Sequence, residues 1–85
     1  MKFFLVDDDP DILALLTRVL GGAGHEVQTT VSSLEALNRI PLERPDCVIS
    51  DIMMPEMDGF ELTRELRRRV ELAEMKIIVL SAKTY

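Results

Sequence analysis

The chain has 85 residues, of which 47% are hydrophobic and 29% charged, with a formal net charge of -5. This length suits one small domain, and the negative charge argues against nucleic acid or an anionic membrane surface as a direct partner. The apolar runs are far shorter than the ~20 residues needed to cross a bilayer. Cys47 is the single cysteine, so we expect a reduced thiol in the cytoplasm and no internal disulfide.

The first predicted unit is a strand over residues 2–6 followed by a helix. Asp7, Asp8 and Asp9 follow the strand directly. Asp9 is expected to cap the helix, with Pro10 at its first position, where the missing N–H costs nothing. Apolar residues at helical spacing continue the helix to Leu20, and the glycines at positions 21, 22 and 24 are predicted to end it.

The second predicted unit is a strand over residues 25–30 and a short helix from Ser32 to Ile40. Ser32 and Glu35 have the spacing of a capping box. Pro41 and Pro45 are expected to bracket the loop that follows, residues 42–44. His25 lies beside a glycine turn, and we interpret it as a surface residue because no second histidine or cysteine lies near it in the sequence.

The stretch from Asp46 to Phe60 is the most informative part of the sequence. Residues 47–50 are apolar without alternation, which is typical of a strand buried on both faces, and Asp51 ends this strand. Pro55 and the Asp58-Gly59 pair predict a loop. A carboxylate at the end of a buried strand is costly, which favours a functional role. The alternative is that Asp51 only caps a turn or the next helix.

The remaining sequence predicts a helix from Phe60 to Val70 and a strand over residues 77–80. The helix is expected to bury Phe60, Leu62, Leu66 and Val70. Three pairs on its solvent side have ion-pair spacing, namely Glu61–Arg64, Glu65–Arg68 and Glu65–Arg69. The three arginines at 67–69 are interpreted as a solvated helix face and not as a nucleic-acid patch.

This alternation of strands and helices predicts an α/β fold with a doubly wound parallel sheet of order 2-1-3-4. The first and third strands are then neighbours, so Asp7, Asp8 and Asp51 converge on one crevice. Their charges repel one another, and a divalent cation relieves that repulsion. Oxygen ligands favour Mg²⁺, Mn²⁺ or Ca²⁺ over Zn²⁺. Ser81, at the end of the fourth strand, adds a hydroxyl at the same edge of the sheet.

Three blocks of the sequence strongly resemble the receiver domain of bacterial two-component response regulators. They are residues 4–10 (FLVDDDP), 51–59 (DIMMPEMDG) and 79–82 (VLSA), and residues 24–27 (GHEV) resemble the family's entry to the second strand. The resemblance covers the whole chain. It implies a flavodoxin-like fold and a cytoplasmic, phosphorylation-controlled signalling switch that is not an enzyme.

The resemblance also implies roles for individual residues. Asp51 would accept a phosphoryl group from a histidine kinase. Mg²⁺, or Mn²⁺, would be bound by the side chains of Asp8 and Asp51, by the backbone carbonyl of Met53, and by Asp7 mostly through water. Ser81 would be the hydroxyl that turns toward the phosphoryl group on activation. An output domain or effector protein is the further partner that the family implies.

The sequence departs from the family pattern at its end. Receiver domains have a fifth strand with an aromatic switch residue and a lysine at its end, flanked by two more helices, and Lys83 does not occupy that lysine's place. We therefore expect residues 1–85 to be a single receiver domain truncated after the fourth strand. The exposed edge of that strand predicts a homodimer centred on residues 77–85, with Lys76 and Lys83 beside it.

Two other functions compete with this interpretation. The Asp7-x-Asp9 pattern is similar to the haloacid dehalogenase motif of aspartate-nucleophile phosphohydrolases. That motif has Thr or Val where Asp11 stands here, and it would leave residues 51–59 unexplained. The second alternative is a receiver-like interaction module in which phosphorylation no longer has a role, because the fifth-strand lysine is missing.

Overall fold

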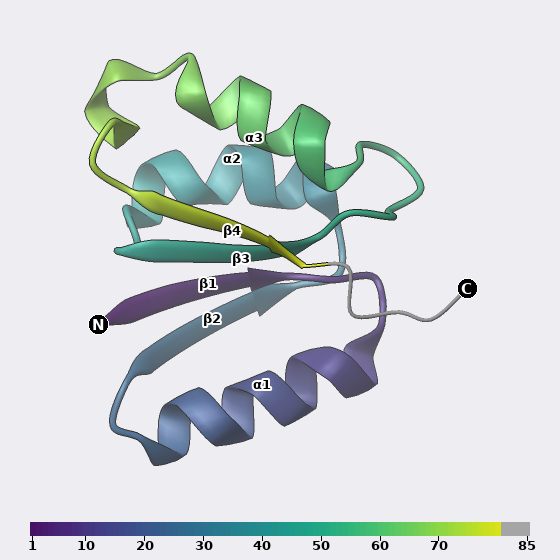
Figure 1. Ribbon diagram of the computed structural model, residues 1–85, viewed down its shortest axis with the longest axis vertical. Coiled ribbons are helices and arrows are strands. Elements are labelled where there is room, and N and C mark those ends of the chain that lie inside the picture. The colour runs from purple at the N-terminus through teal and green to yellow at the C-terminus, as the bar shows by residue number, and fades with distance from the viewer. Residues whose placement is uncertain (81–85) are drawn as a thin grey trace.

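The computed structural model describes residues 1–80 and has a four-stranded parallel sheet between layers of helices (Figure 1). The strands are β1 (Lys2–Val6), β2 (Glu26–Thr30), β3 (Cys47–Asp51) and β4 (Lys76–Leu80), in the order β2-β1-β3-β4. The helices are α1 (Pro10–Gly22), α2 (Ser33–Glu43) and α3 (Gly59–Arg67), with a short 3-10 helix η1 (Val70–Leu72). The predicted doubly wound α/β fold is confirmed. None of the helices in residues 1–80 has the length and apolar character of a membrane span.

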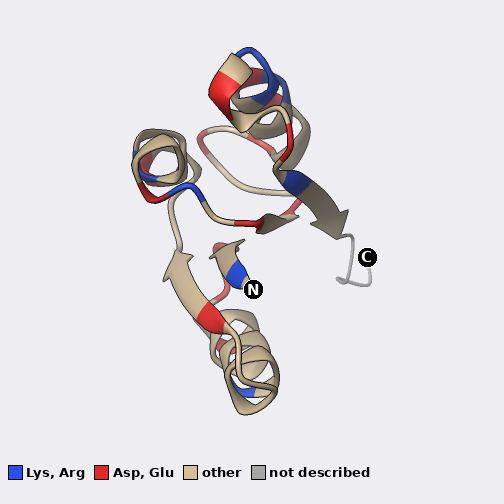
Figure 2. Ribbon diagram, turned by 90° about the vertical axis from the view of Figure 1, so that its left-hand side faces the viewer, with Lys and Arg blue, Asp and Glu red and all other residues tan. Residues whose placement is uncertain are grey.

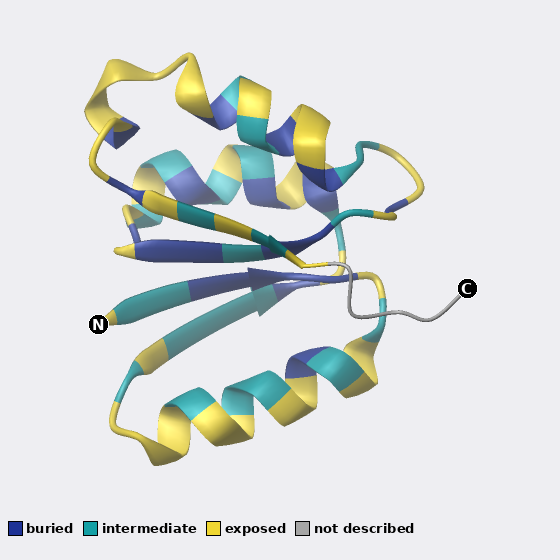
Figure 3. Cartoon of the chain, in the orientation of Figure 1, coloured by how far each residue is buried: buried dark blue, intermediate teal, exposed yellow. Residues whose placement is uncertain are grey.

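The main core lies between the sheet and the α2–α3 layer, while α1 covers the opposite face beside β2 (Figure 1, Figure 3). Phe4, Val6 and Val48 of the central strands are fully buried in this core. Cys47 is also buried and free, as predicted. On β4, Ile78 keeps 45% of its surface exposed. The helix on that face, α1, packs against β2, which is the outer strand on the opposite side of the sheet from β4.

The start of α1 is built as the sequence predicts. The Asp9 carboxylate accepts a hydrogen bond from the backbone N–H of Asp11 at 2.9 Å, and Pro10 is the first helical residue. The predicted end is two residues too early, because α1 continues through Gly22. Glycine lowers helix stability without forbidding helical geometry. Gly24, with φ of 91°, is the residue that takes the left-handed conformation after the helix.

The start of α2 is confirmed and its predicted end is wrong. The Ser32 hydroxyl accepts from the backbone N–H of Glu35 at 3.1 Å. Pro41 lies inside the last turn of the helix, and residues 42 and 43 are helical instead of forming the predicted loop. A proline within a helix removes its own N–H bond and crowds the carbonyl four residues earlier, which disfavours the helix without forbidding it. The helix ends at Arg44, which has φ of 47° and donates its N–H to the Ile40 carbonyl at 2.8 Å.

The third helix is shorter than predicted. It buries Leu62 and Leu66 but ends at Arg67, while Phe60 is exposed and Val70 begins η1 with 72% of its surface exposed. One of the three predicted ion pairs is confirmed, because Glu65 contacts Arg68 at 3.5 Å, while Glu61–Arg64 and Glu65–Arg69 do not form. The three arginines at 67–69 are exposed, as predicted for a solvated face, and Figure 2 shows acidic and basic residues intermixed on this layer.

The amino end of the sheet holds His25. Its Nδ1 lies 3.0 Å from the nitrogen of the chain's first residue, and its ring packs edge-to-face against Phe3 with centroids 5.1 Å apart. Among residues 1–80, the only group of three or more potential metal ligands is formed by aspartates, so His25 is not part of it.

Candidate functional site

Asp7, Asp8 and Asp51 meet at the carboxyl ends of β1 and β3. One carboxylate oxygen from each residue lies within 4.8 Å of the other two. The two strands are parallel neighbours, with Val6 opposite Ser50, so both chains leave the sheet side by side. The structure thus brings together the three carboxylates that the sequence predicts to converge. We call these three residues the acidic cluster.

Two members of the acidic cluster are buried and held by backbone donors. Asp7 is 8% exposed and its Oδ1 accepts from the N–H of Asp9 at 2.9 Å. Asp51 is 4% exposed and its Oδ1 accepts from the N–H of Ile52 at 2.9 Å. Asp8 is exposed. Carboxylates taken out of water beside other carboxylates are costly to keep charged, and a cation at the cluster offsets that cost.

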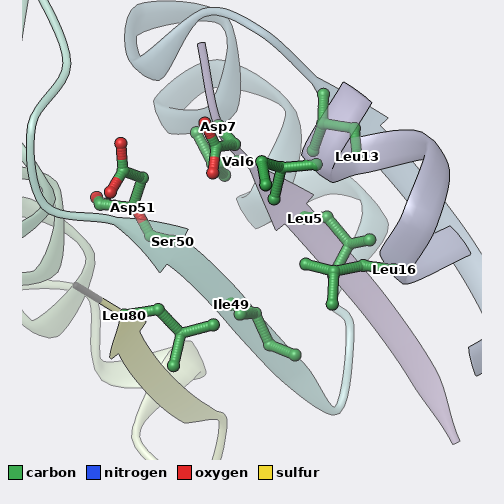
Figure 4. A pocket seen from close by; sticks show the side chains of 10 residues that line it. Leu5, Val6, Asp7, Leu13, Leu16, Ile49, Ser50, Asp51 and Leu80 are labelled. Carbon is green, nitrogen blue, oxygen red and sulfur yellow. Dashed lines mark hydrogen bonds between the residues drawn. The ribbon is translucent and has the colours of Figure 1, made fainter. Parts of the chain in front are cut away.

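An apolar groove adjoins the acidic cluster. It encloses a volume of only about 20 Å³ and runs between α1 and strands β1, β3 and β4. Figure 4 shows Asp7 and Asp51 at one end, with Leu16, Ile49 and Leu80 lining the rest. The site is therefore acidic at the edge of the sheet and apolar beneath it.

The loop from Ile52 to Asp58 joins the acidic cluster to α3. Met53 has an exposed side chain two residues after Asp51, while Met54 is buried in the core and anchors the loop. Asp58 caps α3, because its Oδ1 accepts from the N–H of Glu61 at 2.8 Å and Glu61 accepts from the N–H of Asp58 at 3.2 Å. Ser81 and Lys83 lie outside the described residues.

Sequence reasoning missed the capping role of Asp58 and the packing role of Gly59, and treated both as turn residues. Asp58 and Glu61 have the same spacing as Ser32 and Glu35, so this spacing signalled the second cap as well. Gly59 packs against the backbone at the end of β3, where its N–H donates to the Ile52 carbonyl at 2.8 Å. No local sequence signal predicts this contact, because it depends on how α3 docks against the sheet.

The comparisons with known proteins agree with this geometry. The family model described as "Response regulator receiver domain" matches residues 3–85. The response regulator MprA of Mycobacterium avium is 37% identical over 83 residues, which are 98% of this chain and 36% of that protein. MprA of Mycobacterium leprae is 36% identical over the same length. The chain spans about a third of the length of these curated relatives.

Solved structures give the same result. The chemotaxis protein CheY4 of Vibrio cholerae matches with a TM-score of 0.90 and 34% identity, over 99% of this chain and 70% of that one. The receiver domain of the sensor histidine kinase PA1611 of Pseudomonas aeruginosa, described with magnesium in its active site cleft, matches with a TM-score of 0.89 and 27% identity, over 96% and 67%. Fold, sequence and a family match over residues 3–85 all agree, and the chain belongs to the response regulator receiver domain family.

Proposed function

We propose that this chain is a phosphorylation-controlled switch of a two-component system, in which Asp51 accepts a phosphoryl group from a histidine kinase. The observation that carries the proposal is the position of Asp51 at the end of β3, beside Asp7 and Asp8. Its carboxylate is fixed by the N–H of Ile52, so it is oriented before a donor arrives. The expected cytoplasmic location and the output domain or effector partner belong to the same proposal.

The nucleophile that this chain supplies is the carboxylate of Asp51. An oxygen of Asp51 attacks the phosphorus, a P–O bond to the carboxylate forms, and the P–N bond to the kinase imidazole breaks. The product is an acyl phosphate on Asp51. Asp7, held by the N–H of Asp9, keeps negative charge close to the reacting carboxylate, so the phosphoryl oxygens need a compensating cation.

The acidic cluster fits such a cation. Its three carboxylates lie within 4.8 Å of one another and offer only oxygen donors, which suits Mg²⁺ or Mn²⁺. Asp8 and Asp51 would hold the ion through their side chains, Asp7 mostly through water, and Met53 through its carbonyl. When bound, the ion neutralises charge on the phosphoryl oxygens. The magnesium described for the PA1611 receiver domain supports this assignment.

Intact mass spectrometry after incubation with Mg²⁺ and acetyl phosphate tests the phosphoacceptor. We expect one phosphoryl adduct on the wild type and none on Asp51→Asn, which keeps the shape and removes the nucleophile. Asp11→Asn is the matched control, because Asp11 is an exposed aspartate on α1 and should leave the adduct unchanged. An adduct that survives Asp51→Asn refutes the assignment.

Two further outcomes of the same assay identify the competing functions. Turnover of a phosphomonoester without a stable adduct would support the phosphohydrolase, and no reaction would support the interaction module. Ser81 keeps the role that the resemblance implies, as a hydroxyl that turns toward the phosphoryl group. Ser81→Ala should therefore still become phosphorylated at Asp51.

We also propose that the chain forms a homodimer through the exposed edge of β4. This strand lies at the end of the described sheet, and Ile78 and Leu80 keep 45% and 38% of their surface exposed. Leu15 and Val19 on α1 are also exposed. Apolar edge strands pair readily with another chain, and exposed apolar patches mark interfaces.

Light scattering on a sizing column at micromolar concentration tests the dimer. We expect the wild type to elute as a dimer and Ile78→Lys to shift it toward monomer. Val70→Lys adds the same charge at an exposed apolar residue of η1, away from β4, and should leave the dimer intact. A monodisperse wild-type monomer with a cooperative melt would contradict the proposal.

A further inference from the structure

Gly59, the first residue of α3, lies in contact with the backbone at the end of β3. A Cβ atom built at this position would lie 2.3 Å from the carbonyl oxygen of Asp51, and 3.1 Å from both the carbonyl carbon of Asp51 and the Cα of Ile52. Contacts below 3.0 Å do not occur for real Cβ atoms. All three atoms belong to the backbone, so no flexible side chain can move aside to relieve the clash.

Hydrogen bonds hold Gly59 in this position. Its N–H donates to the Ile52 carbonyl at 2.8 Å, and the Thr63 hydroxyl donates to the Gly59 carbonyl at 2.7 Å. Asp58, the residue before it, forms the capping box that fixes the first turn of α3. The start of the helix is therefore docked directly on Asp51, the last residue of β3, and on Ile52, which follows it.

The glycine is required by space and not by backbone conformation. Among the described glycines, Gly24 is the one with a positive φ, while Gly59 starts an α-helix with an ordinary one. Alanine is a better helix former than glycine, so α3 taken alone would be favoured by alanine here. Only the approach to Asp51 excludes a side chain.

The same peptide group connects this contact to the Asp51 carboxylate. The carbonyl of Asp51 and the N–H of Ile52 belong to one planar unit, so a displacement of the carbonyl oxygen also moves that N–H. The Ile52 N–H donates to Asp51 Oδ1 at 2.9 Å and orients the carboxylate within the acidic cluster. A Cβ at position 59 would therefore displace the Asp51–Ile52 peptide group, and this displacement would shift the N–H that orients the Asp51 carboxylate.

We propose that Gly59 is a positioning residue for the phosphoacceptor, whose missing side chain allows α3 to hold the Asp51–Ile52 peptide in the orientation that the acidic cluster requires. This inference rests on the proposed function of Asp51. It assigns to Gly59 a role in the geometry of the site that is separate from its role in starting the helix.

The test compares Gly59→Ala with the wild type for phosphorylation by acetyl phosphate over a range of Mg²⁺ concentrations. A misplacement of about 1 Å can reduce the rate of a positioned reaction about 100-fold, so we expect a loss of about 10- to 100-fold and a higher Mg²⁺ concentration at half-maximal rate. Gly22→Ala is the matched control, because nothing lies within 4 Å of a Cβ at Gly22 on α1. Its rate and Mg²⁺ dependence should equal those of the wild type.

Leu66→Ala separates positioning from general weakening of α3. Leu66 is fully buried in the core, so its truncation destabilises the same helix without adding an atom beside Asp51. At a temperature where the variants are folded by circular dichroism, Leu66→Ala should keep the wild-type Mg²⁺ dependence. A folded Gly59→Ala with wild-type rate and Mg²⁺ dependence would overturn the inference, as would an equal shift in Leu66→Ala.

Thr63→Val provides a second test if Gly59→Ala does not fold. It removes the hydroxyl that holds the Gly59 carbonyl and should raise the half-saturating Mg²⁺ concentration about fivefold, the equivalent of one neutral hydrogen bond. An unchanged value would overturn the inference. If the wild type is phosphorylated normally, such a result refutes only the role of Gly59. If the wild type shows neither an adduct nor a rise in melting temperature with Mg²⁺, the proposed function and the role of Gly59 are both refuted.

Discussion

The guanidinium carbon of Arg39 on α2 lies 4.9 Å from the centre of the Phe4 ring on β1, in the middle of the sheet. The same guanidinium donates to Glu35 and Glu43 at 2.9 Å each, and to the Thr29 carbonyl on β2 at 3.1 Å. One side chain thus joins α2 to the two strands beneath it. This arrangement stabilises the layer opposite α1.

We predict that Arg39→Gln lowers the free energy of unfolding by about 1–2 kcal/mol, because it removes the cation–π contact and two helical ion pairs. Arg39→Lys should recover only part of the loss, since an ammonium cannot make the forked contacts of a guanidinium. Urea unfolding measures both values. Arg18→Gln, at an exposed arginine on α1, is the control and should change stability little. If Arg39→Lys is as stable as the wild type, the forked hydrogen bonds of the guanidinium do not contribute to stability.

The capping box of α3 gives a second prediction. Asp58→Ala removes the acceptor for the N–H of Glu61 and should cost about 1 kcal/mol of unfolding free energy. Asparagine is also a good N-cap, so Asp58→Asn should retain most of that stability. Chemical denaturation of the three proteins under one condition measures the difference. If Asp58→Asn is as unstable as Asp58→Ala, the charge of Asp58 and not its capping bond is the stabilising feature.

Metal binding should stabilise the fold. The three carboxylates of the acidic cluster repel each other, and an ion that binds only the folded chain adds about 2.7 kcal/mol at a concentration 100 times its Kd. We expect the melting temperature to rise with millimolar Mg²⁺ and to fall again with EDTA. Asp8→Ala should abolish the rise, while Asp11→Ala should preserve it. An equal response of Asp8→Ala and the wild type would show that the ion binds elsewhere.

The buried thiol of Cys47 predicts a loss of stability at alkaline pH. Burial, with a smaller contribution from Asp46, raises the pKa of the Cys47 thiol above its ordinary value, although Lys76 acts in the opposite direction. Above about pH 8.5 the unfolded chain therefore releases the thiol proton more readily than the folded chain, and stability falls as pH rises toward the folded pKa. Urea unfolding from pH 7 to 10 should show a steeper fall for the wild type than for Cys47→Ala. Parallel slopes would contradict this.

The sequence predicted the strands because their apolar runs are local patterns, and it predicted the acidic cluster because the alternation of strands and helices implies a parallel sheet of known strand order. Short apolar runs ended by Asp7 and Asp51 define the central strands, and the parallel order of those strands brings their ends together. The helix ends were predicted less well. Pro41 and Gly22 disfavour a helix locally, but both lie within helices here. Both residues lower helix stability without forbidding helical geometry, so neither one fixes the residue at which a helix ends.

The opposite error occurred in α3. Val70 continues the apolar helical pattern, but the helix has ended by Arg67 and Val70 faces solvent on η1. The contact of Gly59 with Asp51 could not be predicted from the sequence either. It joins α3 to β3, and the relative position of these elements is fixed only in the folded chain. The docking of α3 against the end of β3 is therefore a feature that the sequence did not reveal.

The position of β1 between β2 and β3 has a consequence for the order of folding. Asp8 and Asp51 are 43 positions apart in the sequence, and they meet only after β1 pairs with β3 around the whole β2–α2 segment. Closing such a long loop is among the slower steps for a small domain. A cation that requires both carboxylates therefore finds its site only in chains that have completed this pairing. Such an ion would slow unfolding far more than it speeds folding, so we expect bound metal to extend the lifetime of the folded state.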